Sequence, residues 1–92
     1  MAIVFIPTPL RKFTNQSSKV EIPGDNVLEV IQALSSTYPP LQRHLINADG
    51  KVPNFINIFV DDDDIRNLQY EQTEVKSSTI VSIVPAIAGG AN

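Results

Sequence analysis

The chain has no cysteine and no tryptophan, and its 92 residues include one histidine and one methionine. Without cysteine, neither a disulfide framework nor a thiolate metal site can form. Positive charge is also scarce, because seven Lys and Arg residues stand against ten Asp and Glu residues and the formal net charge is −3. This balance argues against nucleic acid or an anionic membrane as the main partner.

Long apolar runs and a leader segment are missing as well. No stretch approaches the roughly 20 apolar residues of a membrane span. The opening residues "MAIVFIPTPL" carry no basic leader, so we expect no signal peptide and a cytoplasmic protein. The hydrophobic fraction of 42% and the charged fraction of 18% suit one small globular domain.

Apolar periodicity predicts a sheet with one main helix. Apolar residues recur at helical spacing after Asn26 and stop at Pro39, which predicts a helix over Asn26–Tyr38. Asn26 and Glu29 have the spacing of a capping box at its start. One further helical turn is expected over residues 41–46. Strands are expected over residues 2–6, 19–22, 54–60 and 79–84.

These elements together predict an α+β domain over residues 1–85, a mixed sheet with the helix packed on one face. A flexible tail over residues 86–92 follows it. Residues 61–68 are expected to form a turn, and a further short strand before the last one is left open. The side chains expected in the core are Val4, Ile31, Leu34, Ile58, Val81 and Ile83.

Two groups of residues suggest metal or catalytic chemistry, and both have simpler interpretations. Counted from Asp61, a calcium loop needs Gly at the sixth position and Glu at the twelfth, where the chain has Arg66 and Gln72. The acidic run is then a solvated turn that protects a sheet edge. His44 has no cysteine and no obvious carboxylate partner, which favours a packing role. We therefore expect no metal, no cofactor and no catalytic activity.

Two phenylalanines of the third predicted strand are candidates for binding a partner. If the alternate residues of that strand face the helix, Phe55 and Phe59 lie on the open face of the sheet. Ile80 and Val84 join them if the last strand pairs beside this one. Such an apolar patch often marks a partner site. The alternative is that the loop over residues 10–18 covers it.

The tail contains a Gly-Gly pair, Gly89 and Gly90, followed by Ala91 and Asn92. Glycines can lie extended in a channel too narrow for a Cβ atom, and they leave the Gly90 carbonyl open to attack. Because no catalytic group is apparent elsewhere, the chain suits a carrier whose Gly90 carboxylate another protein activates. The alternative is a tail without function.

Four segments together resemble the ubiquitin-like sulfur carrier proteins of the MoaD/ThiS family, which have a β-grasp fold. The likeness is in particular to carriers of the cysteine-biosynthesis type, which share an N-I-x-V-[ND]-x-[DE]-D-[IV]-R stretch and a P-A-[IV]-A-G-G end. The segments in this chain are "IPTPLRKFT", "GDNVLEVIQAL", "FINIFVDDDDIR" and "IVSIVPAIAGG".

The resemblance implies a specific chemistry at Gly90. In this family an ATP-dependent adenylyltransferase, similar to the enzymes that activate ubiquitin, adenylates the terminal glycine, and sulfur then replaces AMP to give a thiocarboxylate. The carrier passes this sulfur to a biosynthetic enzyme. By this resemblance Ala86, Ala88 and Gly89 would thread the partner's channel, and Phe59 with its neighbours would dock.

The residues after Gly90 depart from the family pattern, in which carriers that are active as encoded stop at Gly-Gly. The resemblance implies that a zinc-dependent peptidase of the JAMM type cuts between Gly90 and Ala91. The alternatives are a precursor or an inactive relative. Two further functions stay open: a ubiquitin-like modifier joined through Gly90 to lysines, and a non-catalytic binding module without tail chemistry.

Overall fold

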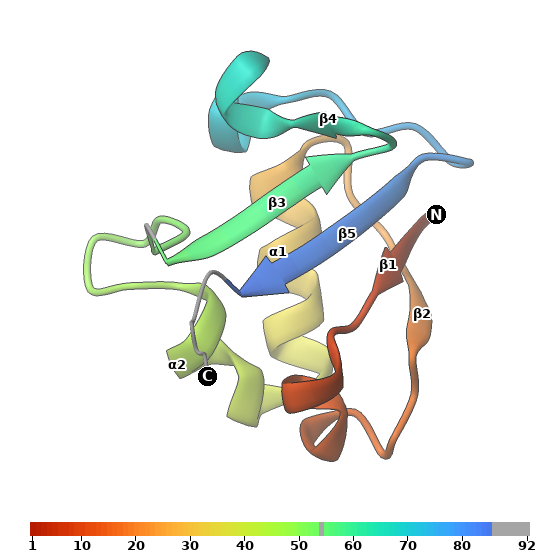
Figure 1. Cartoon of the computed structure of the whole chain (residues 1–92), viewed down its shortest axis with the longest axis vertical. Helices are drawn as coiled ribbons and strands as arrows, with labels where there is room; N and C mark the ends of the chain where they lie inside the picture. The colour runs from red at the N-terminus through yellow and green to blue at the C-terminus, as the bar shows by residue number, and fades with distance from the viewer. Residues whose placement is uncertain (54, 86–92) are drawn as a thin grey trace.

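A computed structural model of the chain describes residues 1–53 and 55–85, and in this part five strands form one mixed sheet. The strands are β1 (Ala2–Phe5), β2 (Lys19–Ile22), β3 (Ile56–Val60), β4 (Asp63–Asp64) and β5 (Ile80–Pro85). Their order across the sheet is β2-β1-β5-β3-β4 (Figure 1). The central strand β5 pairs in parallel with β1, and the other three pairings are antiparallel.

One long helix, α1 (Val27–Thr37), lies across one face of this sheet (Figure 1). Val30, Ile31 and Leu34 follow one another at three- and four-residue spacing, so they share the face that packs on the sheet, and all three are fully buried. A mixed sheet with one main helix on one face is the β-grasp arrangement. The structure thus confirms both the α+β prediction and the β-grasp fold.

Of the two hydrogen bonds predicted for the capping box of the helix, one is present and the other is not. The Asn26 side-chain oxygen accepts a hydrogen bond from the backbone N–H of Glu29 at 2.9 Å, as an N-cap should. The Glu29 carboxylate does not return to Asn26. It accepts from the backbone N–H of Asp25 at 2.8 Å, one residue earlier. Two backbone donors are still satisfied at the start of α1.

Short helical segments connect the main elements. The turn predicted over residues 41–46 is helical, and it follows directly on a 3₁₀ turn that begins at Pro39. Leu41 and Leu45 from this region are fully buried under α1. The segments are η1 (Thr8–Phe13), η2 (Pro39–Leu41), α2 (Gln42–Leu45), η3 (Ile65–Asn67) and η4 (Tyr70–Gln72).

The core lies between α1 and the covered face of the sheet. The strand register brings these core side chains together, because Val4 and Val60 both stand opposite Val81, and Ile58 stands opposite Ile83. The six side chains predicted in the core, which are Val4, Ile31, Leu34, Ile58, Val81 and Ile83, are all at most 3% exposed.

Two predictions about the strands need correction. The third strand begins at Ile56, two residues later than predicted, since the chain turns just before it. The stretch predicted as a turn contains the edge strand β4, whose Asp63 and Asp64 pair with Val60 and Phe59. An acidic edge strand discourages pairing with another chain, which agrees with the predicted role of the acidic run.

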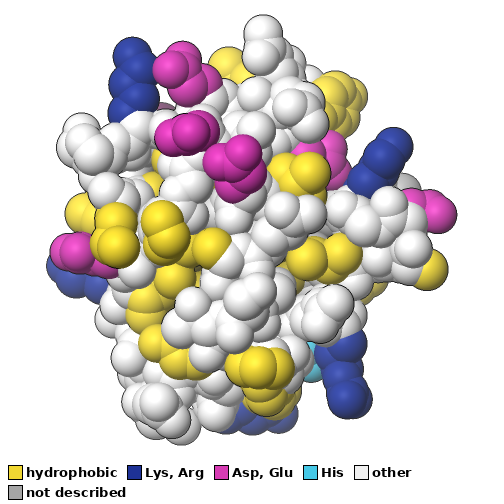
Figure 2. Space-filling view, turned by 180° about the vertical axis from the view of Figure 1, so that it is seen from behind, with side chains coloured by type: hydrophobic (Ala, Val, Ile, Leu, Met, Phe, Trp, Pro, Cys, Tyr) yellow, Lys and Arg dark blue, Asp and Glu magenta, His cyan; other side chains and the backbone are white. Residues whose placement is uncertain are grey.

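Charge is unevenly distributed over the surface. In Figure 2 several Asp and Glu side chains gather in the upper part of the view, toward the end of the molecule where α1 begins, and others lie at its left and right edges. Negative charge near a helix N-terminus is favourable because of the helix dipole. Across the described ranges, none of the helices has the length and apolar character needed to cross a bilayer. The predicted tail over 86–92 lies outside the described residues.

Candidate functional site

A row of side chains runs across the open face of the sheet, through all five strands. Phe5 of β1 stands opposite Ser82 of β5, which in turn stands opposite Phe59 of β3. At the edges, Lys19 pairs with Phe5 and Asp64 pairs with Phe59. Since paired residues share a face, two aromatic rings flank Ser82 and are themselves bordered by charges of opposite sign.

Three of the predicted docking residues belong to this face. β5 pairs beside β3, as the prediction required, so Ile80 and Val84 lie on the same face as Phe59. Val84 is 44% exposed, whereas Phe59 and Ile80 are half-buried. Phe5 is 43% exposed and extends the surface onto β1, although the sequence analysis did not include it. We name Phe5, Phe59, Ile80 and Val84 the open-face patch; its docking role remains a prediction.

Phe55 is placed differently from the prediction. It lies in the turn before β3, where the Ile56 N–H donates to the Pro53 carbonyl at 3.0 Å. Its side chain is 49% exposed, but no register pair assigns it to the open face. Alternation along the chain assigns a side chain to one face only within an extended strand, and the chain turns at Phe55.

The loop over residues 10–18 packs at one end of the sheet and leaves the patch accessible. Leu10 is buried in the core, and the Phe13 ring stacks on His44 of α2 with centroids 5.0 Å apart. The loop is thereby held against α2. Because Phe5 and Val84 each keep more than two fifths of their surface exposed, the alternative that this loop covers the open face is wrong for them.

A hollow of about 370 Å³ lies where β5 ends and the tail begins. Its walls include Phe5 and Val84 of the open-face patch, Arg11 of η1, and Pro85, the last described residue. The Arg11 Nε–H donates to the Ile6 carbonyl at 3.0 Å, which fixes this side chain beside the hollow. The described part of the chain therefore ends next to exposed apolar side chains.

Arg66 is a residue of this face that the sequence analysis did not assign. From η3 its guanidinium donates to the side-chain oxygen of Asn57 on β3, in the row next to Phe59. Asp64 caps η3 by accepting from the Arg66 backbone N–H at 2.9 Å. The sequence did contain a sign that these two residues matter, since Asn57 and Arg66 are the first and last residues of the N-I-x-V-[ND]-x-[DE]-D-[IV]-R motif.

The turn between β3 and β4 explains another position of this motif. Asp61 has a φ of 56°, a left-handed conformation that Asn, Asp and Gly adopt most easily. Its carboxylate accepts from the Ile80 N–H at 3.2 Å, and its own N–H donates to the Ile80 carbonyl at 2.7 Å. Asp61 thus has a structural role in joining the hairpin to β5.

No group of three His, Cys, Asp or Glu side chains could hold a metal ion within residues 1–53 and 55–85. His44 is half-buried against Phe13, which confirms its predicted packing role. The predicted tail residues Ala86, Ala88, Gly89, Gly90 and Ala91 lie outside the described residues.

Comparison with known proteins places the chain in a family. It matches the ThiS family over residues 4–90. It is 36% identical over 89 residues to the sulfur carrier protein CysO of Mycobacterium tuberculosis (strain ATCC 25618 / H37Rv), covering 95% of this chain and 96% of that protein. A chain in the crystal structure of the Amycolatopsis orientalis BexX/CysO complex is 37% identical, with a TM-score of 0.89, covering 98% of this chain and 100% of that chain.

A third similar structure is the small archaeal modifier protein 1 of Methanosarcina acetivorans. It is 26% identical, with a TM-score of 0.82, and the match covers 97% of this chain and 95% of that chain. The family match includes the second half of β1, the four later strands, α1 and the Gly-Gly pair. The chain therefore belongs to the ThiS family.

Proposed function

We propose that the protein is a sulfur carrier whose Gly90 carboxylate is adenylated and then converted to a thiocarboxylate. The extent of the family match carries this proposal, because it runs through Gly89 and Gly90 and ends there. The relative that is 36% identical over nearly the whole chain is a sulfur carrier protein, which supports the same activity.

The chemistry proceeds in two steps that both involve the carboxyl group of Gly90. The Gly90 carboxylate attacks the α-phosphate of ATP, so that acyl-adenylate forms and pyrophosphate leaves. Hydrosulfide then attacks the Gly90 carbonyl carbon, the bond to the AMP oxygen breaks, and a proton is released with AMP as the thiocarboxylate forms. The carrier supplies only the carboxylate, whereas an ATP-dependent adenylyltransferase supplies the catalytic groups. We accordingly assign the protein no enzymatic activity of its own.

The position of the last described strand supports this role, because it ends beside the open-face patch. β5 is the central strand and is held on both sides by β1 and β3. It ends at Pro85, next to the hollow that Phe5 and Val84 help to line. An enzyme that docks on the open-face patch would receive Ala86, Ala88 and Gly89 in a narrow channel leading to its ATP.

Gly90 is joined by a peptide bond to Ala91, so its carboxylate must first be released. We propose that a zinc-dependent JAMM-type peptidase hydrolyses this bond and removes Ala91 and Asn92. The thiocarboxylate would then donate its sulfur to a biosynthetic enzyme in the cytoplasm. The similarity to CysO favours cysteine as the product.

A protein modifier is the second candidate. It is favoured by the similarity to the small archaeal modifier protein 1. A modifier uses the same adenylated Gly90, but a lysine amine in place of hydrosulfide attacks the carbonyl. The two functions therefore differ in the nucleophile and share the same activation step.

The test compares the full chain with a version ending at Gly90, each incubated with the adenylyltransferase of the same organism and ATP. We expect pyrophosphate release only from the version ending at Gly90. Added sulfide should then raise its intact mass by the difference between sulfur and oxygen. Gly90→Ala in that version is the control and should react poorly, because a Cβ atom crowds the carbonyl. Equal adenylation of both versions, or none of the shorter one, would exclude this function. Lysine-linked conjugates in cells without any thiocarboxylate would favour the modifier.

A further inference from the structure

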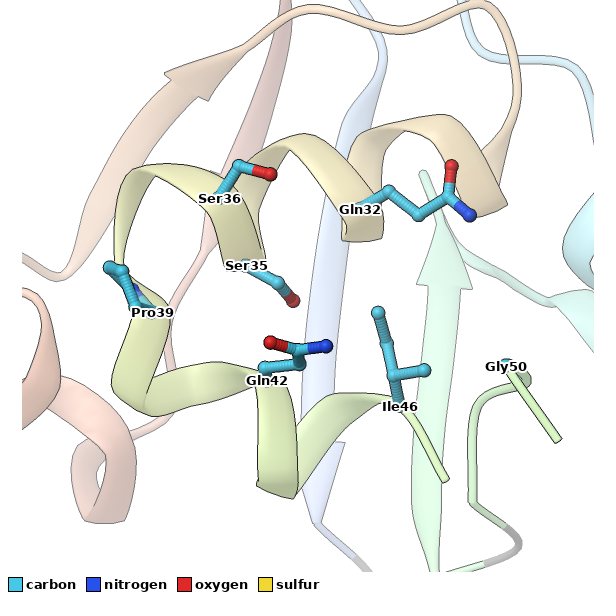
Figure 3. Close-up of a pocket in the computed structure, with 7 residues that line it drawn as sticks. All are labelled: Gln32, Ser35, Ser36, Pro39, Gln42, Ile46 and Gly50. Carbon is cyan, nitrogen blue, oxygen red and sulfur yellow. The ribbon is translucent and has the colours of Figure 1, made fainter. Parts of the chain in front are cut away.

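A hollow of about 540 Å³ lies between α1 and α2, and none of its lining residues belongs to the open-face patch (Figure 3). The sheet lies behind it in that view. Four polar side chains line the hollow: Gln32, Ser35 and Ser36 from α1, and Gln42 from α2.

The Ser35 hydroxyl is the most informative of these groups. Ser35 is only 6% exposed, and its Oγ atom has no hydrogen-bond partner. In Figure 3 this hydroxyl points from α1 toward Gln42, into the space between the two helices. A buried hydroxyl without a partner destabilises a fold, and native proteins contain few of them. A hydrogen bond from a bound molecule would remove this penalty.

The other polar side chains at the hollow are also available. Within the described residues, the side chains of Gln32, Ser36 and Gln42 make no hydrogen bond and no ion pair. A primary amide both donates and accepts, and so does a hydroxyl. Two amides and two hydroxyls therefore face one hollow with all of their hydrogen-bonding capacity unused by the fold.

The chemistry of the lining indicates a neutral ligand. No charged side chain lines the hollow, and its apolar walls come from Pro39 and Ile46. Small-molecule sites are usually enclosed, whereas this hollow is open to solvent, and polar and apolar surfaces contribute nearly equally to its lining. A peptide backbone offers neutral donors and acceptors in alternation, which the side chains of Gln32, Ser35 and Gln42 can match. We propose that the hollow binds a neutral peptide segment of a partner protein through these side chains.

This site goes beyond the proposed sulfur chemistry, because it uses neither the tail nor the open-face patch. The hollow where the tail begins is lined by β1, β5 and η1, and the two hollows share no residue. A partner bound between α1 and α2 leaves the open-face patch accessible to a second protein. The carrier can therefore remain attached to one partner while another acts on its tail.

The first test measures the stability of the free protein. Removing the Ser35 hydroxyl should stabilise the fold if the hydroxyl serves only to bind a partner, and destabilise it if the fold itself uses the hydroxyl. Ser35→Ala should raise the melting temperature of the free protein, because it removes a buried hydroxyl that nothing satisfies. Ser36→Ala is the matched control, since it brings the same gain in helix propensity at an exposed neighbour. The rise in melting temperature should be larger for Ser35→Ala than for Ser36→Ala. A lower melting temperature for Ser35→Ala would show that the fold itself uses the hydroxyl, and would overturn the proposal.

The second test measures binding with a displayed library of random peptides, selected against the full chain. Enriched peptides should be uncharged where they contact the protein. They should shift the NMR signals of Gln32, Ser35 and Gln42, and bind roughly tenfold more weakly to Ser35→Ala and to Gln42→Glu. Phe5→Ala, which changes an exposed residue of the open-face patch, should bind them unchanged. No enrichment, equal binding to Gln42→Glu, or loss of binding with Phe5→Ala would overturn the proposal, and none of these results would affect the test of Gly90.

Discussion

The guanidinium of Arg66 donates hydrogen bonds to the side-chain oxygen of Asn57 and, at 3.4 Å, to the backbone oxygen of Ile56. This contact ties η3 back to the beginning of β3, across the hairpin that β3 forms with β4. Asp61 holds the turn of the same hairpin to β5. The motif from Asn57 to Arg66 is therefore one structural unit that supports the edge of the open face.

Arg66→Ala should lower the free energy of unfolding by about 0.5–1.5 kcal/mol, because it removes hydrogen bonds from a charged donor at a partly exposed site. Arg43→Ala is the matched control. Arg43 is exposed on α2 and makes no hydrogen bond or ion pair with another described residue, so the change should be close to neutral. Urea unfolding of the two variants measures the difference. Equal losses would mean that the contact with Asn57 contributes nothing to stability.

Leu34→Ala should cost about 2–5 kcal/mol, because the side chain is fully buried between α1 and the sheet. A small domain has a total stability of about 5–15 kcal/mol, so the loss is a large fraction of it. Gln32→Ala on the exposed side of α1 serves as the control and should change stability by less than about 0.5 kcal/mol. A loss below about 1 kcal/mol for Leu34→Ala would contradict this packing.

Two glycines with positive φ should respond differently to the same substitution. At Gly24 (φ 153°) a Cβ atom would lie 2.8 Å from both the backbone nitrogen and the Cγ2 atom of Val30. At Gly50 (φ 77°) a Cβ atom would meet nothing within 4 Å. Gly24→Ala should cost about 2–4 kcal/mol from strain and overpacking together, and Gly50→Ala about 1–2 kcal/mol from strain alone.

Thermal unfolding of these two variants, with Gly50→Asn beside them, separates the two effects. Asn adopts the left-handed conformation more easily than Ala, so Gly50→Asn should recover part of the loss. The same loss at both glycines would mean that the approach of α1 to Gly24 does not constrain the chain.

The sequence predicted the core and the helix well because both follow from apolar periodicity. Ile31 and Leu34 are three residues apart on α1, and Ile58 and Val81 alternate with half-buried residues on their strands. Periodicity also predicted that Phe59 faces away from the helix. It failed at Phe55, because a tight turn interrupts the pattern without changing the residue types.

Other features depend on contacts between distant segments, which periodicity does not report. Phe5 belongs to the open-face patch only because β1 pairs in parallel with β5, more than seventy positions later in the chain. The hollow at Ser35 requires α2 to lie beside α1, and the serine itself resembles any other helical serine. Asn57 and Arg66 stood in a recognised motif, yet only the folded hairpin shows that they bind each other.

The open-face patch should contribute to docking of the adenylyltransferase, and Phe5→Ala is the cleanest test. Phe59 is half-buried, so its truncation would also affect stability, whereas Phe5 is 43% exposed and lies beside the hollow where the tail begins. Phe5→Ala should weaken association by about 1–3 kcal/mol if the ring is a binding hot spot.

Tyr70→Ala is the control for that experiment, because Tyr70 is an aromatic residue 57% exposed on η4, outside the open-face patch. It should bind the enzyme as the unaltered protein does. Isothermal titration of both variants, each ending at Gly90, gives the affinities, and circular dichroism checks that the fold is kept. The enzyme needs to reach the tail where β5 ends, so a ring beside Pro85 should matter and a ring on η4 should not. Equal affinity of Phe5→Ala and Tyr70→Ala, or a greater loss with Tyr70→Ala, would place the docking surface elsewhere.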